Sequence, residues 1–141
     1  MPRAPEFFAP APLFGVAVLL LNDHVFKSAF HNTLTGKLSD VAGCFLLPLY
    51  VSAVLALLTN LAWQHRVAIG AALTALLFTS IKLSPRVSEV VTSSLEVLSQ
   101  PLGMAQLHVV ADPTDLVALP MIALAVFAAR RSHACTAALS N

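Results

Sequence analysis

Charged residues are scarce in this chain. Only 11% of its 141 residues are Asp, Glu, Lys or Arg, whereas 57% are hydrophobic, and soluble domains carry roughly 25% charged residues. A water-soluble fold of this length could not bury so much apolar surface, but a lipid bilayer can accept it. The composition therefore excludes an ordinary soluble protein. It predicts an integral membrane protein with a single domain, residues 1–141.

Two further absences narrow the functional classes. The net charge is only +1 and no run of Lys and Arg occurs, so the electrostatic signature of a nucleic-acid-binding protein is missing. The two cysteines, Cys44 and Cys135, share no short spacing, which predicts neither a disulfide framework nor a zinc ribbon. We expect both to be small apolar fillers. No cofactor is predicted.

Long apolar runs make up most of the sequence. About 20 apolar residues are needed to cross the hydrocarbon core of a bilayer. The clearest run, 41–63, contains no charged residue and ends at Trp63, which is typical of an interfacial anchor. The runs predict four transmembrane helices, at residues 7–22, 41–63, 67–81 and 116–129.

Residues 85–100 form a segment that is too polar to cross a bilayer. Ser84 followed by Pro85 is a favourable helix start, and apolar residues then recur at helical spacing opposite a polar face. We predict an amphipathic helix lying in the membrane interface; a helix packed over the end of the bundle is the alternative. The predicted fold is all-α, a polytopic bundle of about four transmembrane helices plus this interfacial helix.

Two polar islands, residues 22–40 and 82–115, interrupt the apolar runs. Two predicted spans separate the islands, so both should emerge on the same side of the membrane. Polar groups held against a bilayer are costly and often have a function. Six charged residues of the islands are therefore candidate ligand-binding residues: Asp23, Lys27, Lys37, Asp40, Asp112 and Asp115.

Helix capping and ion pairing are the structural alternatives for these residues. Ser39 or Asp40 would cap the span at 41–63, with the acid at the positive end of the helix dipole. The sequence Asp-Pro-Thr-Asp at 112–115 has the order of a strong helix start. Asp23 and Lys27 lie four positions apart, so they would form an ion pair on a helix.

Three of these segments resemble the VanZ-like superfamily of small bacterial membrane proteins. The segments are Thr35-Gly36-Lys37-Leu38-Ser39-Asp40-Val41, Asp112-Pro113-Thr114-Asp115-Leu116, and Asn22-Asp23 with Lys27. The resemblance implies a four- or five-helix bundle in the bacterial inner (plasma) membrane. It also implies action at the cell envelope, which in some members of the family is linked to glycopeptide antibiotic tolerance.

The leading functional prediction is a site on one membrane face that binds an anionic lipid or a cell-wall precursor. Lys27 and Lys37 would contact phosphate, and the four aspartates would orient the ligand. Membrane lipid is thus the predicted partner. One alternative is a non-catalytic subunit that forms a homo-oligomer, or a membrane-disrupting effector, indicated by the small residues of 68–75. The other is an intramembrane enzyme that uses paired carboxylates or a metal held by Asp23, His24, Asp112 and Asp115.

Overall fold

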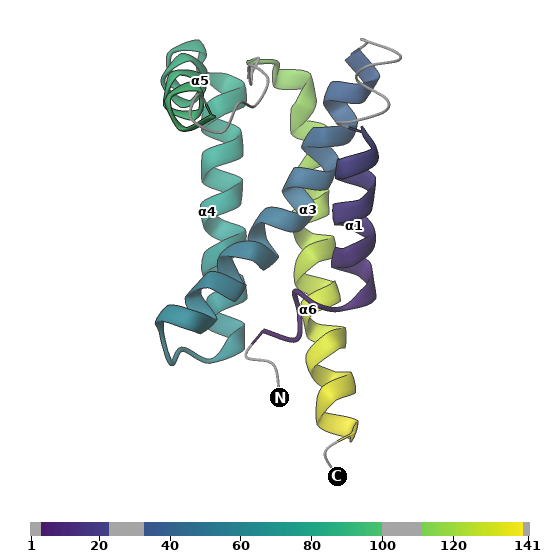
Figure 1. Ribbon diagram of the computed structural model, residues 1–141. Helices are drawn as coiled ribbons and strands as arrows, with labels where there is room; N and C mark the ends of the chain where they lie inside the picture. The colour runs from purple at the N-terminus through teal and green to yellow at the C-terminus, as the bar shows by residue number, and fades with distance from the viewer. Residues whose placement is uncertain (1–3, 23–32, 100–110, 140–141) are drawn as a thin grey trace. The chain divides into compact units, whose positions relative to one another are not determined.

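The computed structural model describes residues 4–22, 33–99 and 111–139. Every regular element in these ranges is a helix, in the order α1 (Pro10–Leu21), α3 (Thr33–Leu58), α4 (Trp63–Leu83), α5 (Pro85–Ser99), the short 3₁₀ helix η3 (Pro113–Ala118) and α6 (Pro120–Leu139) (Figure 1). The predicted all-α class is therefore confirmed for the described residues. The chain divides into two compact units, residues 1–75 with 118–141 and residues 76–117.

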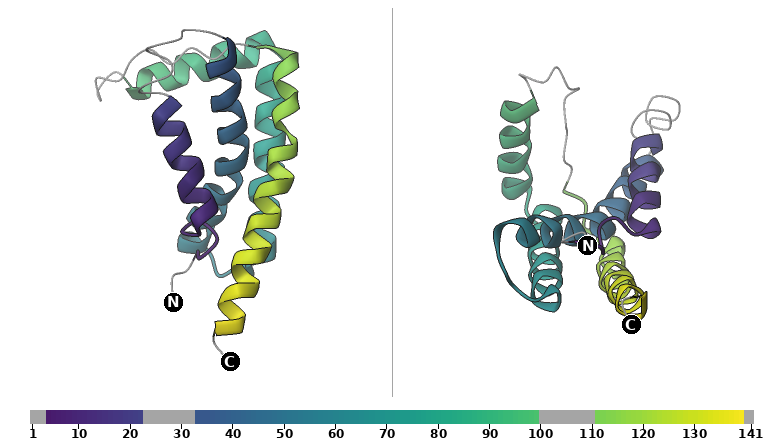
Figure 2. Two further views of the ribbon diagram at one scale, coloured as in Figure 1. Left: turned by 90° about the vertical axis from the view of Figure 1, so that its right-hand side faces the viewer. Right: turned by 60° about the horizontal axis from the view of Figure 1, so that its bottom comes forward.

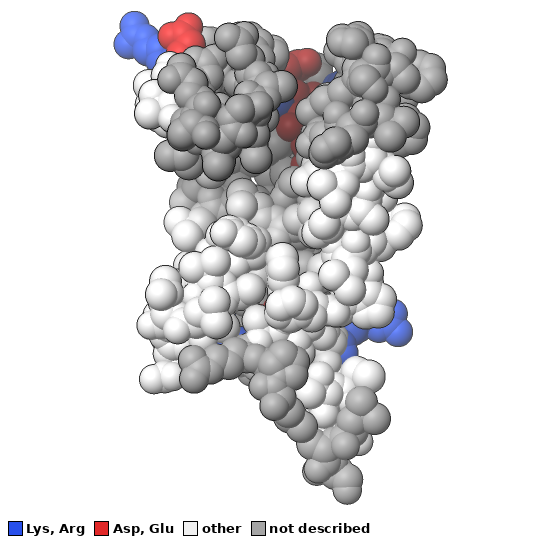
Figure 3. Space-filling model, viewed as in Figure 1, with Lys and Arg blue, Asp and Glu red and all other residues white. Residues whose placement is uncertain are grey.

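Three helical segments are long and apolar enough to cross a membrane: Gly36–Leu58, Trp63–Leu83 and Pro113–Ala138. They indicate an integral membrane protein, and in Figure 3 uncharged side chains cover most of the visible surface of the described residues. The remaining predicted span corresponds to α1, which has only 12 residues. A helix of that length extends about 18 Å, against a hydrocarbon core of about 30 Å. The count of four spans stays a prediction.

The start of α3 differs from the predicted start of its span. The helix already begins at Thr33, so Ser39 and Asp40 lie inside it, and the prediction that one of them caps it is wrong. The physical reason is that the first turns of α3 are polar but still helical, whereas hydropathy marks only where the apolar run begins. The Ser39 hydroxyl instead accepts a hydrogen bond from the buried Asn22 amide at 2.7 Å, which links the end of α1 to α3.

The other end of α3 also differs. The helix ends at Leu58, and Trp63 begins α4 instead of ending the preceding span. The Leu55 carbonyl in the last turn of α3 accepts hydrogen bonds from both the Thr59 backbone N–H at 2.8 Å and the Thr59 hydroxyl at 2.7 Å. A connection of four residues then leads into α4.

The last two predicted helices are present with altered bounds. The predicted span 116–129 is preceded by η3, and α6 starts at Pro120 and continues to Leu139. Proline suits the first position of a helix because it has no N–H to leave unsatisfied there. The helix predicted at 85–100 is confirmed as α5, and its location in the membrane interface stays a prediction.

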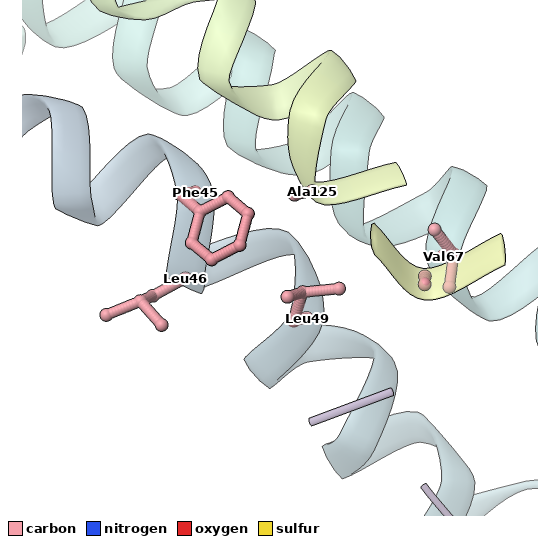
Figure 4. Packing of buried hydrophobic residues seen from close by; sticks show 6 residues of the cluster. Phe45, Leu46, Leu49, Val67 and Ala125 are labelled. Carbon is pink, nitrogen blue, oxygen red and sulfur yellow. The ribbon is translucent and has the colours of Figure 1, made fainter. Parts of the chain in front are cut away.

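In the first unit, α3 packs against both α1 and α6 (Figure 2). The core cluster consists of large residues from α3 and mostly small ones from its neighbours: Phe45, Leu46, Leu49, Val67, Ala125 and Ala129 (Figure 4). Ala125 and Ala129 are fully buried one turn apart on α6, so that helix can lie close to α3. Cys44 is buried, as expected for a small apolar filler, whereas Cys135 is exposed and does not fill the core.

Two glycines lie where α1 and α4 contact α3. A Cβ atom on Gly15 of α1 would lie 3.1 Å from the Leu46 side chain and 3.2 Å from the Phe45 ring. A Cβ atom on Gly70 of α4 would overlap the carbonyl oxygen of Pro48. The small residues of 68–75 thus include one that packs against another helix of the same chain.

Candidate functional site

The predicted residues of the first polar island are only partly described. Asp23 and Lys27 lie outside the described residues. Lys37 and Asp40 lie in the first turns of α3 and are each partly exposed. The predicted contact of Lys37 with phosphate and the predicted role of Asp40 in orienting the ligand therefore stay predictions.

The two aspartates of the second island have different roles. The Asp112 carboxylate accepts a hydrogen bond from the Thr114 backbone N–H at 2.9 Å, and the Asp112 carbonyl accepts one from the Asp115 N–H at 3.1 Å. Asp112 thus caps the helical turn that follows, as predicted, although that turn is the 3₁₀ helix η3.

Asp115 forms a buried ion pair that its sequence position did not reveal. Its carboxylate lies 2.7 Å from Lys82 Nζ, and the two side chains are 10% and 6% exposed. The Lys82 ammonium also lies 5.6 Å from the centre of the Phe78 ring, which is within the range of a cation–π contact. Within the second unit, the charge of Asp115 is therefore balanced by Lys82 at the end of α4.

The metal alternative gains no support from the described residues. In residues 4–22, 33–99 and 111–139, no group of three or more His, Cys, Asp and Glu side chains could hold a metal ion. Asp23 and His24 lie outside these ranges. The prediction that the two islands form one shared site stays a prediction.

A buried carboxylate cluster in the first unit centres on Glu6, whose side chain is fully inaccessible. Ser52 of α3 donates its hydroxyl to Glu6 Oε1 at 2.8 Å, and Arg66 of α4 places Nη2 at 3.4 Å from the same oxygen. His133 of α6 lies with Nε2 at 2.9 Å from Glu6 Oε2. Three helices thus direct one hydroxyl, one guanidinium and one imidazole at a single carboxylate.

The surroundings of this cluster fix its geometry. Trp63 stacks on the His133 ring, with centroids 4.4 Å apart and ring planes 13° from parallel. Arg66 donates a further hydrogen bond to the Leu61 carbonyl at 3.0 Å. The carboxylate, and not the imidazole, stands between the other two groups, so the order differs from that of a Ser-His-acid triad. The contacts instead describe a carboxylate that is bound by hydrogen-bond donors from three helices.

Sequence reasoning did not identify this cluster because its members lie far apart along the chain. The partners of Glu6 are 46, 60 and 127 positions away, so no local spacing connects them. One signal was present: Glu6, Arg66 and His133 are ionisable residues in or beside apolar segments, and such residues usually have a partner inside the bundle.

An apolar groove runs along the first unit between α1, α3 and α6. It consists of two open hollows of about 300 Å³ and about 580 Å³ that share wall residues Ala11, Phe45 and Leu124. The first hollow extends toward Val18 and Leu38, and the second extends toward residues 131–135 of α6. The lining of the first is entirely apolar.

The second hollow ends at a basic residue. Arg131 lines it together with Phe127, and the guanidinium carbon lies 5.8 Å from the centre of the Phe127 ring. Ser132 lines the same end and donates its hydroxyl to the Pro5 carbonyl at 3.2 Å. The groove therefore combines a long apolar surface with an exposed cation in the C-terminal half of α6.

Comparison with protein-family models, with curated proteins and with solved structures gave no match. The resemblance to the VanZ-like superfamily therefore stays a prediction.

Proposed function

We propose that the protein binds an anionic membrane lipid in the groove between α1, α3 and α6. One observation supports this proposal: a wholly apolar hollow adjoins a second hollow that is lined by Arg131. The apolar part suits a hydrocarbon chain, and the guanidinium suits a phosphate group, which it can bind through two parallel hydrogen bonds.

The ligand class follows from this division of the groove. The apolar walls offer an acyl chain contact with side chains but no hydrogen-bond donors, so they add little selectivity. Selectivity for negative charge would come from Arg131, which lies over the Phe127 ring and is exposed. A phospholipid and a cell-wall precursor on a polyprenyl phosphate both combine a hydrocarbon chain with phosphate, so both fit this class.

This proposal keeps the predicted ligand class but assigns the phosphate contact to another residue. Arg131 contributes the cation, while Asp115 is paired with Lys82 and Asp112 caps a helix. The phosphate contacts predicted for Lys27 and Lys37 are not part of this proposal. Homo-oligomerisation, membrane disruption and intramembrane catalysis remain alternatives that no contact of the described residues favours over lipid binding.

Native mass spectrometry of the protein from detergent micelles can test the proposal. The purified chain is mixed with equal amounts of phosphatidylglycerol and phosphatidylcholine, and the ratio of the bound lipids is measured. The wild type should prefer phosphatidylglycerol. Arg131→Gln should lose roughly tenfold of that preference, the size expected when one charge-assisted hydrogen-bonded contact is removed. A parallel titration with undecaprenyl phosphate distinguishes a phospholipid from a cell-wall precursor.

Two matched controls separate the groove from general effects of charge and size. Arg130→Gln removes the same charge from the neighbouring exposed position, which does not line the groove, and should leave the preference unchanged. Ala11→Trp fills the shared wall of both hollows and should reduce binding of both lipids, whereas Ala17→Trp, also on α1, should not. Equal losses from Arg131→Gln and Arg130→Gln, or normal binding by Ala11→Trp, would contradict the proposal.

A further inference from the structure

We propose that Ser52, Arg66 and His133 form an anion-binding site that the chain's own Glu6 occupies, and that an external phosphate or carboxylate group takes the place of Glu6 when the N-terminal segment leaves. Glu6 would then act as a built-in competitor of that ligand. The three donors do not line either hollow of the groove, and the N-terminal segment, residues 4–9, touches the groove only through Ala9, which lines the second hollow.

The first support is the composition of the site. A guanidinium, an imidazole nitrogen and a hydroxyl group converge from three helices on the two oxygens of one carboxylate. The imidazole donates to Glu6 Oε2 when its Nε2 carries the proton. Guanidinium groups recognise carboxylate and phosphate in the same manner. The donors therefore define a class of ligand, a compact oxyanion, and Glu6 is one member of that class.

The second support is that the donors are held in place without Glu6. Leu49 lies one turn before Ser52, Val67 directly follows Arg66, and Ala129 lies one turn before His133, and all three are core residues. Trp63 additionally fixes the plane of the His133 ring. Because the hydrophobic core positions the three helices, removal of Glu6 should leave the donors in the same arrangement.

The third support is that Glu6 lies in a segment without regular secondary structure. It belongs to residues 4–9, a segment of turns and bends that precedes α1 and is outside the regular helices. Its polar contacts with α3, α4 and α6 include those of Glu6 and the hydrogen bond from Ser132 to the Pro5 carbonyl. Phe7 of the segment also packs against the core cluster and the Tyr50 ring. Its departure therefore requires release of Phe7 from these contacts but no unfolding of a helix.

The ligand must carry negative charge. Arg66 is only 9% exposed, and a buried guanidinium that loses a negative neighbour is strongly destabilised. Departure of Glu6 is therefore favourable only when another anion replaces it. A lipid headgroup and a free phosphate ion share this chemistry.

The test uses Trp63, the chain's only tryptophan, as a reporter of the His133 ring. Glu6→Ala is prepared as the full chain in detergent micelles and titrated with inorganic phosphate and with acetate. We expect a saturable change in tryptophan fluorescence, with wild-type protein requiring more phosphate because Glu6 competes. Adding Arg66→Gln to Glu6→Ala should weaken phosphate binding by roughly tenfold or more.

The controls define the outcomes that overturn the inference. Glu89→Ala removes an exposed acid from α5 and should respond to phosphate as the wild type does. Sodium chloride at equal ionic strength should produce no saturable change. Absence of a response in Glu6→Ala, or an equal response when Arg66 is also replaced, would overturn the proposed site.

A refolding measurement covers the case in which Glu6→Ala does not fold alone. Acetate present during refolding should restore the tryptophan emission of the native protein, since it supplies the missing carboxylate. Failure of Glu6→Ala to fold both with and without acetate would overturn the inference, because the donors would then depend on Glu6 itself.

The source of the anion can be identified in a protein that keeps Glu6 and its three donors unchanged. A fluorophore is attached to Phe8→Cys in a Cys135→Ser background, because Phe8 is exposed and lies in the segment that carries Glu6. If phosphatidic acid in phosphatidylcholine vesicles increases the exposure of the label, a lipid headgroup is the ligand. If only inorganic phosphate does so, the ligand is a free anion. If neither does, displacement of Glu6 is wrong.

Discussion

At the scale of single residues, Gly70 lies so close to α3 that the structure has no room for a side chain there. Alanine there would push a methyl group into the Pro48 carbonyl of α3, and backbone cannot move aside as a side chain can. We expect Gly70→Ala to lower the free energy of unfolding by about 1–3 kcal/mol, the usual cost of overpacking. Thermal unfolding in detergent micelles measures the change.

Gly43 of α3 provides the matched control. A Cβ atom at Gly43 would meet no atom within 4 Å, so Gly43→Ala adds helix propensity without a collision, a gain of up to about 1 kcal/mol. An unfolding temperature that falls equally for both alanine variants would show that the close approach at Gly70 is not the cause.

Residues also show where prediction from sequence succeeds and where it fails. The capping role of Asp112 is local, because its partner Thr114 lies two positions away, so the order of residues was sufficient to predict it. The role of Asp115 depends on Lys82, 33 positions earlier, and the role of Glu6 depends on residues of three helices. Such pairs are determined by how helices pack, which no single segment specifies.

At the scale of elements, the buried pair of Lys82 and Asp115 connects the end of α4 to η3 within the second unit. Breaking such a pair leaves one buried charge without its partner, which typically costs about 3–5 kcal/mol. We therefore expect Lys82→Met and Asp115→Leu each to lower the unfolding temperature in micelles.

The double variant distinguishes an ion pair from two independent contributions. Lys82→Met combined with Asp115→Leu replaces both charges by apolar groups and should recover most of the stability lost in either single variant. Arg86→Met, which removes an exposed charge from α5, is the control and should have little effect. Strictly additive losses in the double variant would rule out the pair as a source of stability.

Helices were predicted more reliably than their ends. Apolar runs identify α3, α4 and α6 because hydrocarbon demands length and low polarity. The same signal fails at Thr33–Asp40, where α3 continues through polar residues. It also fails at Thr59 and the following residues, where a break between two apolar helices contains too few charges to be seen in the composition.

At the scale of the whole molecule, the question is whether α1 crosses the membrane. The residues on either side of α1 contact the rest of the first unit at two well-separated positions. Before α1, Glu6 contacts Ser52 and His133; after it, Asn22 contacts Ser39. Ser39 and Ser52 are separated by about 20 Å of helix at 1.5 Å per residue. The short α1 together with its lead-in therefore extends along much of α3 in the opposite direction (Figure 2).

We accordingly expect the segment before α1 and the start of α3 to lie on opposite sides of the membrane, which would make α1 a fourth crossing. Native Cys135 is exposed near the C-terminal end of α6 and serves as the reference for one side, while Cys44 is buried. With Cys135 replaced by serine, single cysteines are introduced at the exposed positions Phe8 and Gly36. A membrane-impermeant maleimide applied to intact cells and to inverted vesicles then reports the side of each.

Phe8→Cys should react from the same side as native Cys135, because Ala9 and Cys135 line the same hollow. Gly36→Cys should react from the other side. If α1 instead lies along one surface without crossing, Phe8→Cys and Gly36→Cys will react from the same side. The contacts of Glu6 with α6 and of Asn22 with α3 could not then both hold in a bilayer of about 30 Å, so the labelling pattern tests the four-span topology and the packing of the first unit together.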